Sequence, residues 1–552
     1  MLHALAATLL LAAPAGPGQA AGLAPEEERA ASAVTEAAIR ADVAFLASDL
    51  LEGRGPGTRG DRLAQAYLAS QLEAMGFEGA APGGGYLQKV PLVGIHARPP
   101  ARVRFTAGGK RLDLAFQADF VAVPGVQQPV AEVRDGEVVF AGYGITAPEY
   151  AWDDFKGADV RGKVLLVMNN DPEDDPALFE GKRRTYYGRW DYKYAEAARH
   201  GAAGVIIIHT TPSAAYPWQV VQTSWGKDTF ELPAAGEPRV QVKAWATEEA
   251  SRRIASLGGK DLDALRAAAL RRDFRPVPLG VRLSLRIEAR VSATETANVL
   301  ARLPGSDAAL AGEAVLFTAH HDHLGMKRDP RPGEDAIYNG AVDNGTGCAA
   351  MLGVARAFRA LPRPPRRTVV MAFVAAEEQG LLGSEWLAAH PPVPVGRIAA
   401  VLNMDGLRPL GRTRDVNMGG LGKSTLDAFV TAAAAAQGRV VTGDPFPERG
   451  HYYRSDQFSF AKAGVPAVSL GGGLDCIGKP EGSCKQAEEE WLRKHYHQPS
   501  DEYRADWDVS GIAEDARLVF LVGRRVAEAD QMPRWNAGDE FEAARQRALA
   551  GH

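Results

Sequence analysis

Histidine and acidic residues follow three apolar segments of this chain, in positions where they could share a metal ion. The apolar segments are residues 315–319, 369–375 and 398–404. The polar side chains that follow them are His320, Asp322, Glu377, Glu378 and Asp405. A single acidic residue in such a place is more often a helix cap or a solvated loop residue. Imidazole and carboxylate groups after three segments together form a ligand set that suits a divalent metal such as Zn²⁺.

Two further segments add side chains of the same kinds. Asp343 lies in a turn at 342–347 that opens a helix, and Tyr496 and His497 lie far downstream. Several carboxylates gathered in one apolar-walled crevice would cost several kcal/mol unless a cation compensated their charge. The pattern therefore indicates one metal site rather than unrelated surface residues.

The segments that carry these residues alternate between strand patterns and helix patterns. Strand patterns cover 315–319, 369–375, 398–404 and 465–470, and helical patterns include 347–359 and 381–389. Such alternation is typical of a largely parallel sheet with helices on both faces. In these sheets, sites form beyond the carboxyl ends of the strands, where the polar residues fall. We predict an α/β fold with a mostly parallel central sheet flanked by helices.

A second α/β pattern interrupts the first. Residues 163–168 and 204–209 form apolar strand patterns, and a helical pattern at 194–200 lies between them. We predict a smaller α/β module inserted at 136–280. The rest of the chain then divides into an N-terminal part of the main domain at 25–135, its larger part at 281–535 and a C-terminal tail at 536–552.

The start of the chain has the pattern of an export signal. Residues 1–20 contain no Lys, Arg, Asp or Glu, and they include a short apolar run followed by small residues. This pattern predicts a signal peptide. No later window holds about 18 uninterrupted apolar residues, so we expect no membrane span in the mature chain. We predict an exported protein, periplasmic or secreted, in which Cys476 and Cys484 could form a disulfide.

The composition excludes several broad classes of protein. The chain has 552 residues, with 63 Lys plus Arg against 68 Asp plus Glu, and a formal net charge of −5. This balance argues against a nucleic-acid binder, because phosphate binding normally requires a basic excess. A hydrophobic fraction of 46% is enough for large buried cores and excludes disorder as the overall description.

The polar segments resemble the ordered motifs of the dizinc exopeptidases of the secreted aminopeptidase and glutamate carboxypeptidase type. The matching motifs are Ala319-His320-His321-Asp322, Asp343-Asn344-Gly345-Thr346-Gly347, Glu377-Glu378, Asn403-Met404-Asp405 and Tyr496-His497-Gln498-Pro499-Ser500-Asp501. The segment 49–58 is similar to the family's N-terminal signature, and the inserted module resembles a protease-associated domain. The resemblance implies the zinc exopeptidase fold, two Zn²⁺ per chain and peptide substrates.

The resemblance also implies a set of metal ligands. His320 and Asp405 would hold one zinc ion, Glu378 and His497 the other, and Asp343 would bridge the two. Five ligands leave each metal an open position, which is typical of a catalytic site.

Three further residues complete the implied machinery. Glu377 would be the general base that takes a proton from water and passes it to the leaving amine. Asp322 would orient the ring of His320. Tyr496 would donate a hydrogen bond to the developing oxyanion, with Tyr452 as its rival.

Some neighbours of these residues carry separate expectations. His321 and His323 are not expected to bind metal, and Asp501 either supports the site or belongs to a surface turn. The resemblance also suggests a cis peptide bond between Asp343 and Asn344.

The leading prediction is a zinc aminopeptidase that removes N-terminal residues from peptides. A glutamate carboxypeptidase-type enzyme is an alternative, and it would need cations such as Arg408, Arg412 or Arg454 around a substrate carboxylate. A glutaminyl cyclase, which resembles this fold with one zinc, fits less well because all five ligands are present. A non-catalytic binding protein is the third alternative, although no ligand has been lost.

Overall fold

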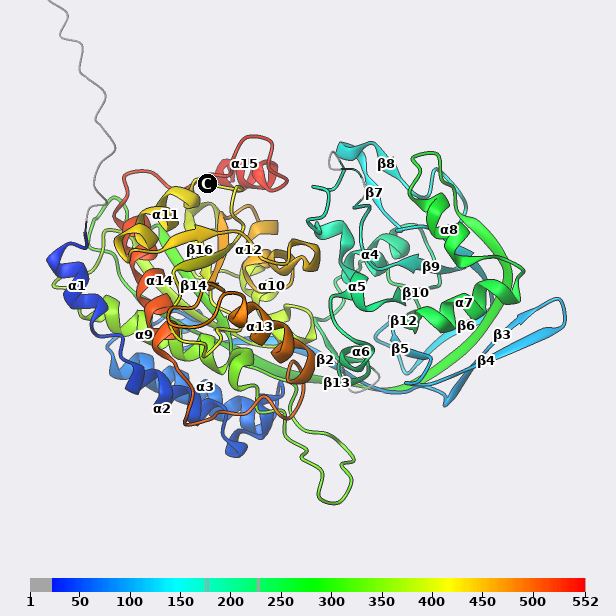
Figure 1. The fold of residues 1–552 in the computed structure, drawn as a ribbon, viewed down its shortest axis with the longest axis horizontal. Helices are drawn as coiled ribbons and strands as arrows, with labels where there is room; N and C mark the ends of the chain where they lie inside the picture. Colours follow the sequence, from blue (N-terminus) through cyan, green and yellow to red (C-terminus); the bar gives the residue numbers. More distant parts are fainter. Residues whose placement is uncertain (1–21, 174, 176–177, 226–228, 552) are drawn as a thin grey trace, which may run out of the picture.

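The computed structural model describes residues 22–551 apart from 174, 176–177 and 226–228. It consists of two bodies that lie side by side, joined by long strands (Figure 1). The predicted export signal at 1–20 lies outside the described residues. Within the described residues, no helix is both long and apolar enough to cross a bilayer.

The larger body, called the main body below, is built on a mixed sheet with a parallel centre. In spatial order its strands are β18 (Val440–Thr442), β17 (Asp415–Gly419), β19 (Ala467–Gly472), β16 (Ile398–Asn403), β14 (Ala314–His320), β15 (Thr368–Val374) and the end of β13 (Val277–Leu303), with β1 (Glu78–Gly79) and β2 (Leu87–Arg98) beyond it. The strands β15, β14, β16 and β19 are parallel. Their carboxyl ends therefore lie at the same edge of the sheet.

Helices cover both faces of this sheet. One face packs against α1 (Pro25–Ala31), α2 (Glu36–Leu46), α3 (Arg59–Ala74), α9 (Gly347–Arg359), α11 (Leu426–Ala436) and α14 (Ser510–Glu528). The other face packs against α10 (Leu382–Ala389) and α12 (Gln457–Lys462). The main body also contains α13 (Ser483–Lys494) and α15 (Glu542–Ala550). Because strand side chains alternate, Phe317 faces the first helical layer and Leu316 the second.

The smaller body, called the inserted module below, has its own cores, shares one continuous sheet with the main body and holds a separate two-stranded sheet. Its strands are β3 (Arg102–Ala107), β4 (Lys110–Ala115), β5 (Phe120–Pro124), β6 (Val130–Phe140), β7 (Thr146–Ala147), β8 (Trp152–Asp153), β9 (Val164–Met168), β10 (Gly204–His209), β11 (Thr229–Glu231) and β12 (Val242–Thr247). The strands β6, β9, β10 and β12 are parallel neighbours. Packed on them are α7 (Glu248–Leu257) and α8 (Leu262–Ala269) in one core, and α4 (Trp190–Arg199) and α6 (Trp218–Ser224) in another, with α5 (Thr211–Ala214) nearby in the chain.

The strand β13 belongs to both bodies (Figure 1). Its residues 299–303 pair with β15 of the main body, whereas residues 277–288 pair with β6 of the inserted module. Residues 288–299 pair with β2. The boundary predicted at residue 280 falls inside this strand, and the proposed domain limits stay a prediction.

The architecture confirms the predicted α/β class. The helix predicted at 347–359 is α9, and the strands predicted at 315–319, 369–375 and 398–404 are β14, β15 and β16 with ends shifted by at most one residue. Long, strongly apolar segments are therefore the part of the fold that the sequence predicts best.

Candidate metal centre

The predicted metal ligands meet at the carboxyl edge of the main sheet. They are His320 at the end of β14, Glu378 in the turn after β15, Asp405 after β16, Asp343 in the turn before α9, and His497 after α13. The structure thus brings together all the residues that the resemblance implied as ligands.

Asp343 lies between two pairs of these residues. Its Oδ1 is 3.2 Å from Nε2 of His320, and its Oδ2 is 3.4 Å from Nε2 of His497. Asp405 Oδ1 lies 3.4 Å from the same His320 nitrogen, and Glu378 Oε2 lies 3.0 Å from the His497 nitrogen. We call His320 and Asp405 the strand side, and Glu378 and His497 the loop side. Asp343 presents one oxygen to each side, as a bridging ligand does.

The donor atoms fit divalent metal ions. Nε2 of His320 is buried and has no hydrogen-bond partner among the described residues, although it faces two carboxylates. Donor triplets within 4.8 Å in the described chain are His320, Asp343 and Asp405; His320, Glu377 and Glu378; and His323, Asp343 and Glu378. Carboxylates gathered in so small a space repel one another unless a cation lies between them.

Glu377 and Asp343 have opposite electrostatic environments. Burial raises the pKa of Glu377 well above its usual value, and the neighbouring carboxylate of Glu378 raises this pKa further. Burial would also raise the pKa of Asp343, but the nearby imidazole rings of His320 and His497 lower that pKa well below its usual value. Glu377 therefore holds a proton more readily than an ordinary carboxyl group does, whereas Asp343 stays charged in this environment.

Asp322 holds the turn η6 (Glu377–Gln379). Its Oδ1 accepts a hydrogen bond from the N–H of Glu377 at 3.0 Å, and its Oδ2 accepts one from the N–H of Glu378 at 3.4 Å. Nδ1 of His320 lies 3.2 Å from the backbone carbonyl oxygen of Asp322 and 3.8 Å from its carboxylate. The His320 ring is therefore contacted by the backbone carbonyl oxygen of Asp322, whereas the sequence suggested that the carboxylate of Asp322 would make this contact.

Asn344 ties the turn that carries Asp343 to the strand side. The Asp343–Asn344 peptide bond is cis, as the resemblance suggested. The Asn344 side chain donates to the carbonyl oxygen of Met404 at 3.1 Å and accepts from the N–H of Gly406 at 3.2 Å. Because Met404 and Gly406 flank Asp405, these bonds fix the position of the segment that carries Asp343 relative to the segment that carries Asp405.

Asp501 links the same turn to the loop that carries His497. It is buried, and its carboxylate accepts hydrogen bonds from the N–H groups of Val342 and Asp343, each at 3.1 Å. The structure thus favours a supporting role over a surface turn.

A chain of hydrogen bonds holds Asp405. Its Oδ2 accepts from the hydroxyl of Ser455 at 2.6 Å, and that hydroxyl accepts from the side-chain amide of Asn403 at 2.8 Å. The Asn403 side chain in turn accepts from the hydroxyl of Thr318 on β14 at 2.7 Å. The strand side is thus cross-linked between two adjacent strands.

The N-terminal segment 49–58 supplies a buried arginine. Arg54 donates to the backbone carbonyl oxygens of His321 at 2.7 Å, Asn339 at 2.5 Å and Gly340 at 2.9 Å. It therefore fixes the segment after β14 against the turn that leads to Asp343.

His323 contacts the metal centre, which the sequence did not indicate. Its Nδ1 lies 2.6 Å from Oε1 of Glu378. His321 points elsewhere, with Nε2 3.0 Å from Asp61 of α3. Because β14 ends at His320, the alternation of a strand does not predict the direction of the side chains that follow.

Of the two candidate tyrosines, Tyr496 is the one beside the ligands. The centroid of its ring lies 3.9 Å from that of His497. Burial raises the pKa of Tyr496 well above its usual value, so its phenol stays protonated and can donate a hydrogen bond. The hydroxyl of Tyr452 donates to the backbone carbonyl oxygen of Ala467 at 3.2 Å.

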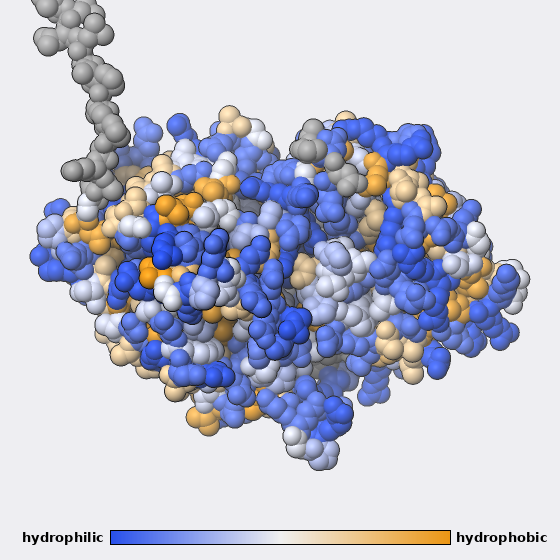
Figure 2. Space-filling model, in the orientation of Figure 1, coloured by the Kyte–Doolittle hydropathy of each residue, from blue (hydrophilic) through white to orange (hydrophobic). Residues whose placement is uncertain are grey.

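Two clefts meet at the metal centre, each partly open to solvent. One, of about 1530 Å³, is lined mainly by the main body, with apolar residues that include Leu407, Phe446, Leu474 and Trp491, and it is also lined by Tyr216 of the inserted module. The other, of about 2180 Å³, lies between the two bodies and is lined by Trp190, Trp225 and Phe230 of the inserted module and Trp386 of the main body. Residues that line both are Tyr216, Glu377, Arg454, Tyr496 and His497. Hydrophilic residues line the seam between the two bodies in Figure 2.

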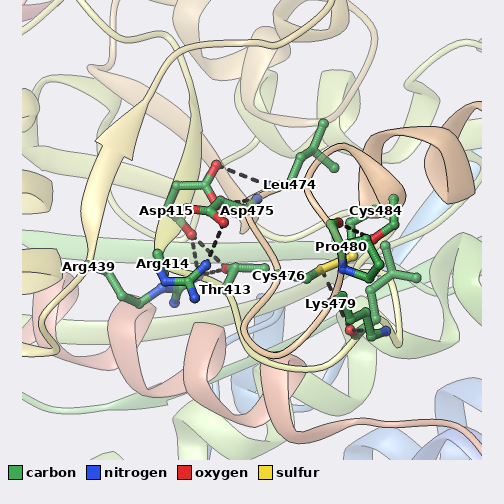
Figure 3. The surroundings of a disulfide bond; sticks show 12 residues. Thr413, Arg414, Asp415, Arg439, Leu474, Asp475, Cys476, Lys479, Pro480 and Cys484 are labelled. Carbon is green, nitrogen blue, oxygen red and sulfur yellow. Dashed lines mark hydrogen bonds and ion pairs between the residues drawn. A yellow bond between two sulfur atoms is a disulfide. The ribbon is translucent and has the colours of Figure 1, made fainter.

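A disulfide fastens one wall of the first cleft. Cys476 and Cys484 are joined, as the sequence allowed (Figure 3). Cys484 lies at the start of α13, whose Glu488 and Trp491 line the cleft. Cys476 lies just after Leu474, which also lines it. The bond therefore ties α13 to the loop after β19.

Two of the arginines that a carboxypeptidase would need are already paired. Arg408 donates two hydrogen bonds to the carboxylate of Glu488, at 2.6 and 3.0 Å. Arg412 forms an ion pair with Glu514 at 2.5 Å. Arg454 lies 5.3 Å from the centroid of the Tyr216 ring.

Comparisons with known proteins find one family model matching within each of the two bodies. Residues 298–521 match the model of Peptidase family M28, and residues 126–245 match that of the PA domain. The solved structure "Aminopeptidase from Aneurinibacillus sp. strain AM-1" is 17% identical with a TM-score of 0.51, covering 92% of this chain and 97% of that one. This likeness shows a shared fold.

Curated relatives match a smaller part of the chain. A vacuolar membrane protease of Candida dubliniensis is 38% identical over 116 residues, which are 21% of this chain and 11% of that protein. Endoplasmic reticulum metallopeptidase 1 of Mus musculus is 30% identical over 146 residues, which are 24% of this chain and 16% of that protein. The chain thus spans only a small share of the length of these relatives.

These relatives contradict the predicted location. The prediction of an exported, periplasmic or secreted protein is wrong, because the relatives are named for the vacuolar membrane and the endoplasmic reticulum. The prediction depended on residues 1–20, which lie outside the described residues. A short apolar run directs a chain into a membrane system, but it does not specify the compartment where the protein stays.

Proposed function

We propose that the chain is a zinc-dependent aminopeptidase, on the premise that residues 298–521 match peptidase family M28 and residues 126–245 match the PA domain. In this proposal it hydrolyses N-terminal residues from peptides with two zinc ions bound per chain. The observation that carries the proposal is the position of Asp343, whose carboxylate oxygens face His320 on one side and His497 on the other.

The ligands divide between two metal sites. We assign His320 and Asp405 to the first, Glu378 and His497 to the second, and Asp343 to both. Each site then has three protein ligands, which leaves room for water and substrate. When bound, zinc would polarise the scissile carbonyl group and lower the pKa of the attacking water.

Glu377 is the group that moves the proton. It lies with His320 and Glu378 in one cluster of donor atoms. Glu377 takes a proton from the attacking water and delivers it to the amine nitrogen as the peptide C–N bond breaks. Tyr496 donates its O–H to the carbonyl oxygen as that oxygen gains negative charge.

The pairing of two arginines favours an aminopeptidase over a carboxypeptidase. A substrate carboxylate needs an unpaired cation, but Arg408 and Arg412 are held by Glu488 and Glu514. Arg454, which lies over the Tyr216 ring and lines both clefts, is the remaining candidate cation for a substrate carboxylate.

Metal removal and terminal blocking test this proposal. A chelator should abolish hydrolysis of aminoacyl anilides, added Zn²⁺ should restore it, and metal analysis should find two zinc ions per chain. Acetylating the N-terminus of a peptide should prevent cleavage, whereas amidating its C-terminus should not. Cleavage that instead required a free C-terminal carboxylate would identify a carboxypeptidase. Absence of both zinc and peptidase activity would identify a binding protein.

A further inference from the structure

We propose that Ser224 of the inserted module is a positioning residue for His497, so that the module completes the loop side of the metal centre. The inference rests on the proposed function, because it takes His497 as a zinc ligand. It assigns the inserted module a direct part in metal binding, in addition to any contact with substrate.

The contact joins the two bodies at the metal centre. The hydroxyl oxygen of Ser224 lies 3.1 Å from Nδ1 of His497. The opposite ring nitrogen, Nε2, faces Glu378 at 3.0 Å and Asp343 at 3.4 Å. If Nε2 binds metal through its lone pair, Nδ1 carries the hydrogen and donates it to Ser224. Metal-bound histidines usually make such a bond, which sets the tautomer and the direction of the ring.

His497 needs this support more than His320 does. His320 ends a β-strand, and its Nδ1 is satisfied by the backbone carbonyl oxygen of Asp322 within the main body. His497 lies in a loop with a φ of 57°, a left-handed conformation that a residue other than glycine adopts only when its surroundings hold it there. One face of its ring lies against Tyr496. The hydroxyl of Ser224 supplies the remaining directional contact.

The inserted module holds Ser224 firmly. Ser224 is the last residue of α6, whose Trp218 and Gln222 side chains both donate to the carbonyl oxygen of Gln117, at 2.7 and 2.9 Å. The next residue, Trp225, packs its ring against that of Trp245, with centroids 6.1 Å apart. A hydroxyl anchored on both sides can define the direction of a neighbouring ring.

A second contact reaches the other loop-side ligand. The backbone N–H of Phe230, in β11, donates to the side-chain oxygen of Gln379 at 3.3 Å. Gln379 directly follows Glu378 in the turn η6. The module therefore contacts the segments of both loop-side ligands.

Zinc affinity tests the proposal without relying on turnover. The metal-free full-length protein is titrated with Zn²⁺ in competition with a chromophoric chelator. Ser224→Ala should weaken one of the two zinc equivalents by about tenfold and leave the other unchanged. Ser224→Thr keeps a hydroxyl and Ser224→Val has the same shape without one, so only the valine variant should weaken binding.

Thr223→Ala is the matched control. Thr223 precedes Ser224 on α6, and its hydroxyl donates to the carbonyl oxygens of Gln219 and Val220. This variant should bind both zinc equivalents as the unaltered protein does. Thermal unfolding of the metal-free variants should match that of the unaltered protein, which separates lost positioning from lost folding.

Two results would overturn the inference. One is a Ser224→Ala variant that binds both equivalents within about twofold of the unaltered protein. The other is equal weakening by threonine and valine, which would show that shape rather than the hydroxyl matters. If the unaltered protein binds two zinc ions but cleaves no N-terminal residue, the proposed function fails while the affinity comparison still decides the role of Ser224.

Discussion

The strand side and the loop side of the metal centre are held in different ways. His320 and Asp405 lie at the ends of parallel strands, and hydrogen bonds within the main body hold both. On the loop side, the segments of Glu378 and His497 are both contacted by the inserted module. The strand side is thus held within the main body alone, whereas the loop side is also contacted by the inserted module.

Removing the carboxylate shared by both sides should have the largest effect. Asp343→Asn keeps the size of the side chain but takes away the charge that faces His320 and His497. We expect loss of both zinc ions, seen by metal analysis, and a fall in kcat/KM of about 10³-fold or more. Asp329→Asn, on an exposed loop, is the control that should behave normally. Retention of two zinc ions by Asp343→Asn would contradict the bridging assignment.

Removing the proposed proton acceptor, Glu377, should lower the rate of hydrolysis without removing metal from either side of the centre. Glu377→Gln should lower kcat by about 10²- to 10⁴-fold while both zinc ions remain bound. Steady-state kinetics together with metal analysis measure the two effects. Glu385→Gln, an exposed residue that lines the cleft between the bodies, should keep kcat. A near-normal kcat in Glu377→Gln would mean that another group takes the proton.

Asp322 connects the strand side to the loop side of the metal centre. Its carboxylate follows a strand-side ligand but holds the turn of the loop side. Asp322→Asn would place an amide N–H₂ against one of two backbone N–H groups, so we expect zinc affinity to fall by about 10- to 100-fold. The titration should assign this loss to one equivalent. Equal weakening of both equivalents would show that the two sides are not independent.

The smallest effect is expected where the inserted module contacts the turn. Gln379→Ala removes one neutral hydrogen bond with the backbone of Phe230. Such a bond contributes about 0.5–1.5 kcal/mol, so we expect kcat/KM to fall by about two- to tenfold. Gln486→Ala, on the exposed surface of α13, should leave kcat/KM unchanged. A much larger loss in Gln379→Ala would mean that the turn depends on the module more than its single bond suggests.

The strand side could be predicted from local sequence. His320 and Asp405 follow long apolar segments, and such segments form buried parallel strands whose carboxyl ends gather at one edge. His497 carries no such signal, because it follows the polar helix α13, and only the motif resemblance indicated it. The strand β13 also carries a local signal, because Val281, Leu283 and Leu285 alternate with exposed residues, as in a half-buried strand.

The supporting contacts could not be predicted from the sequence. Ser224 and His497 are 273 positions apart, and a serine at the end of a short helix has no distinctive spacing. Arg54 lies 267 positions before His321, whose carbonyl oxygen it binds. Such contacts arise only once the two segments have packed against each other, so they follow from tertiary structure rather than from any local pattern.

The shared strand β13 has a mechanical consequence. A strand hydrogen-bonded to the strands of both bodies in one continuous sheet is a stiff connection, because bending between the bodies must break ladder hydrogen bonds or twist the strand. The cleft between the bodies therefore cannot open as widely as it would on a flexible linker. Under the proposed function, a cleft restricted in this way would favour an extended chain end over a folded domain.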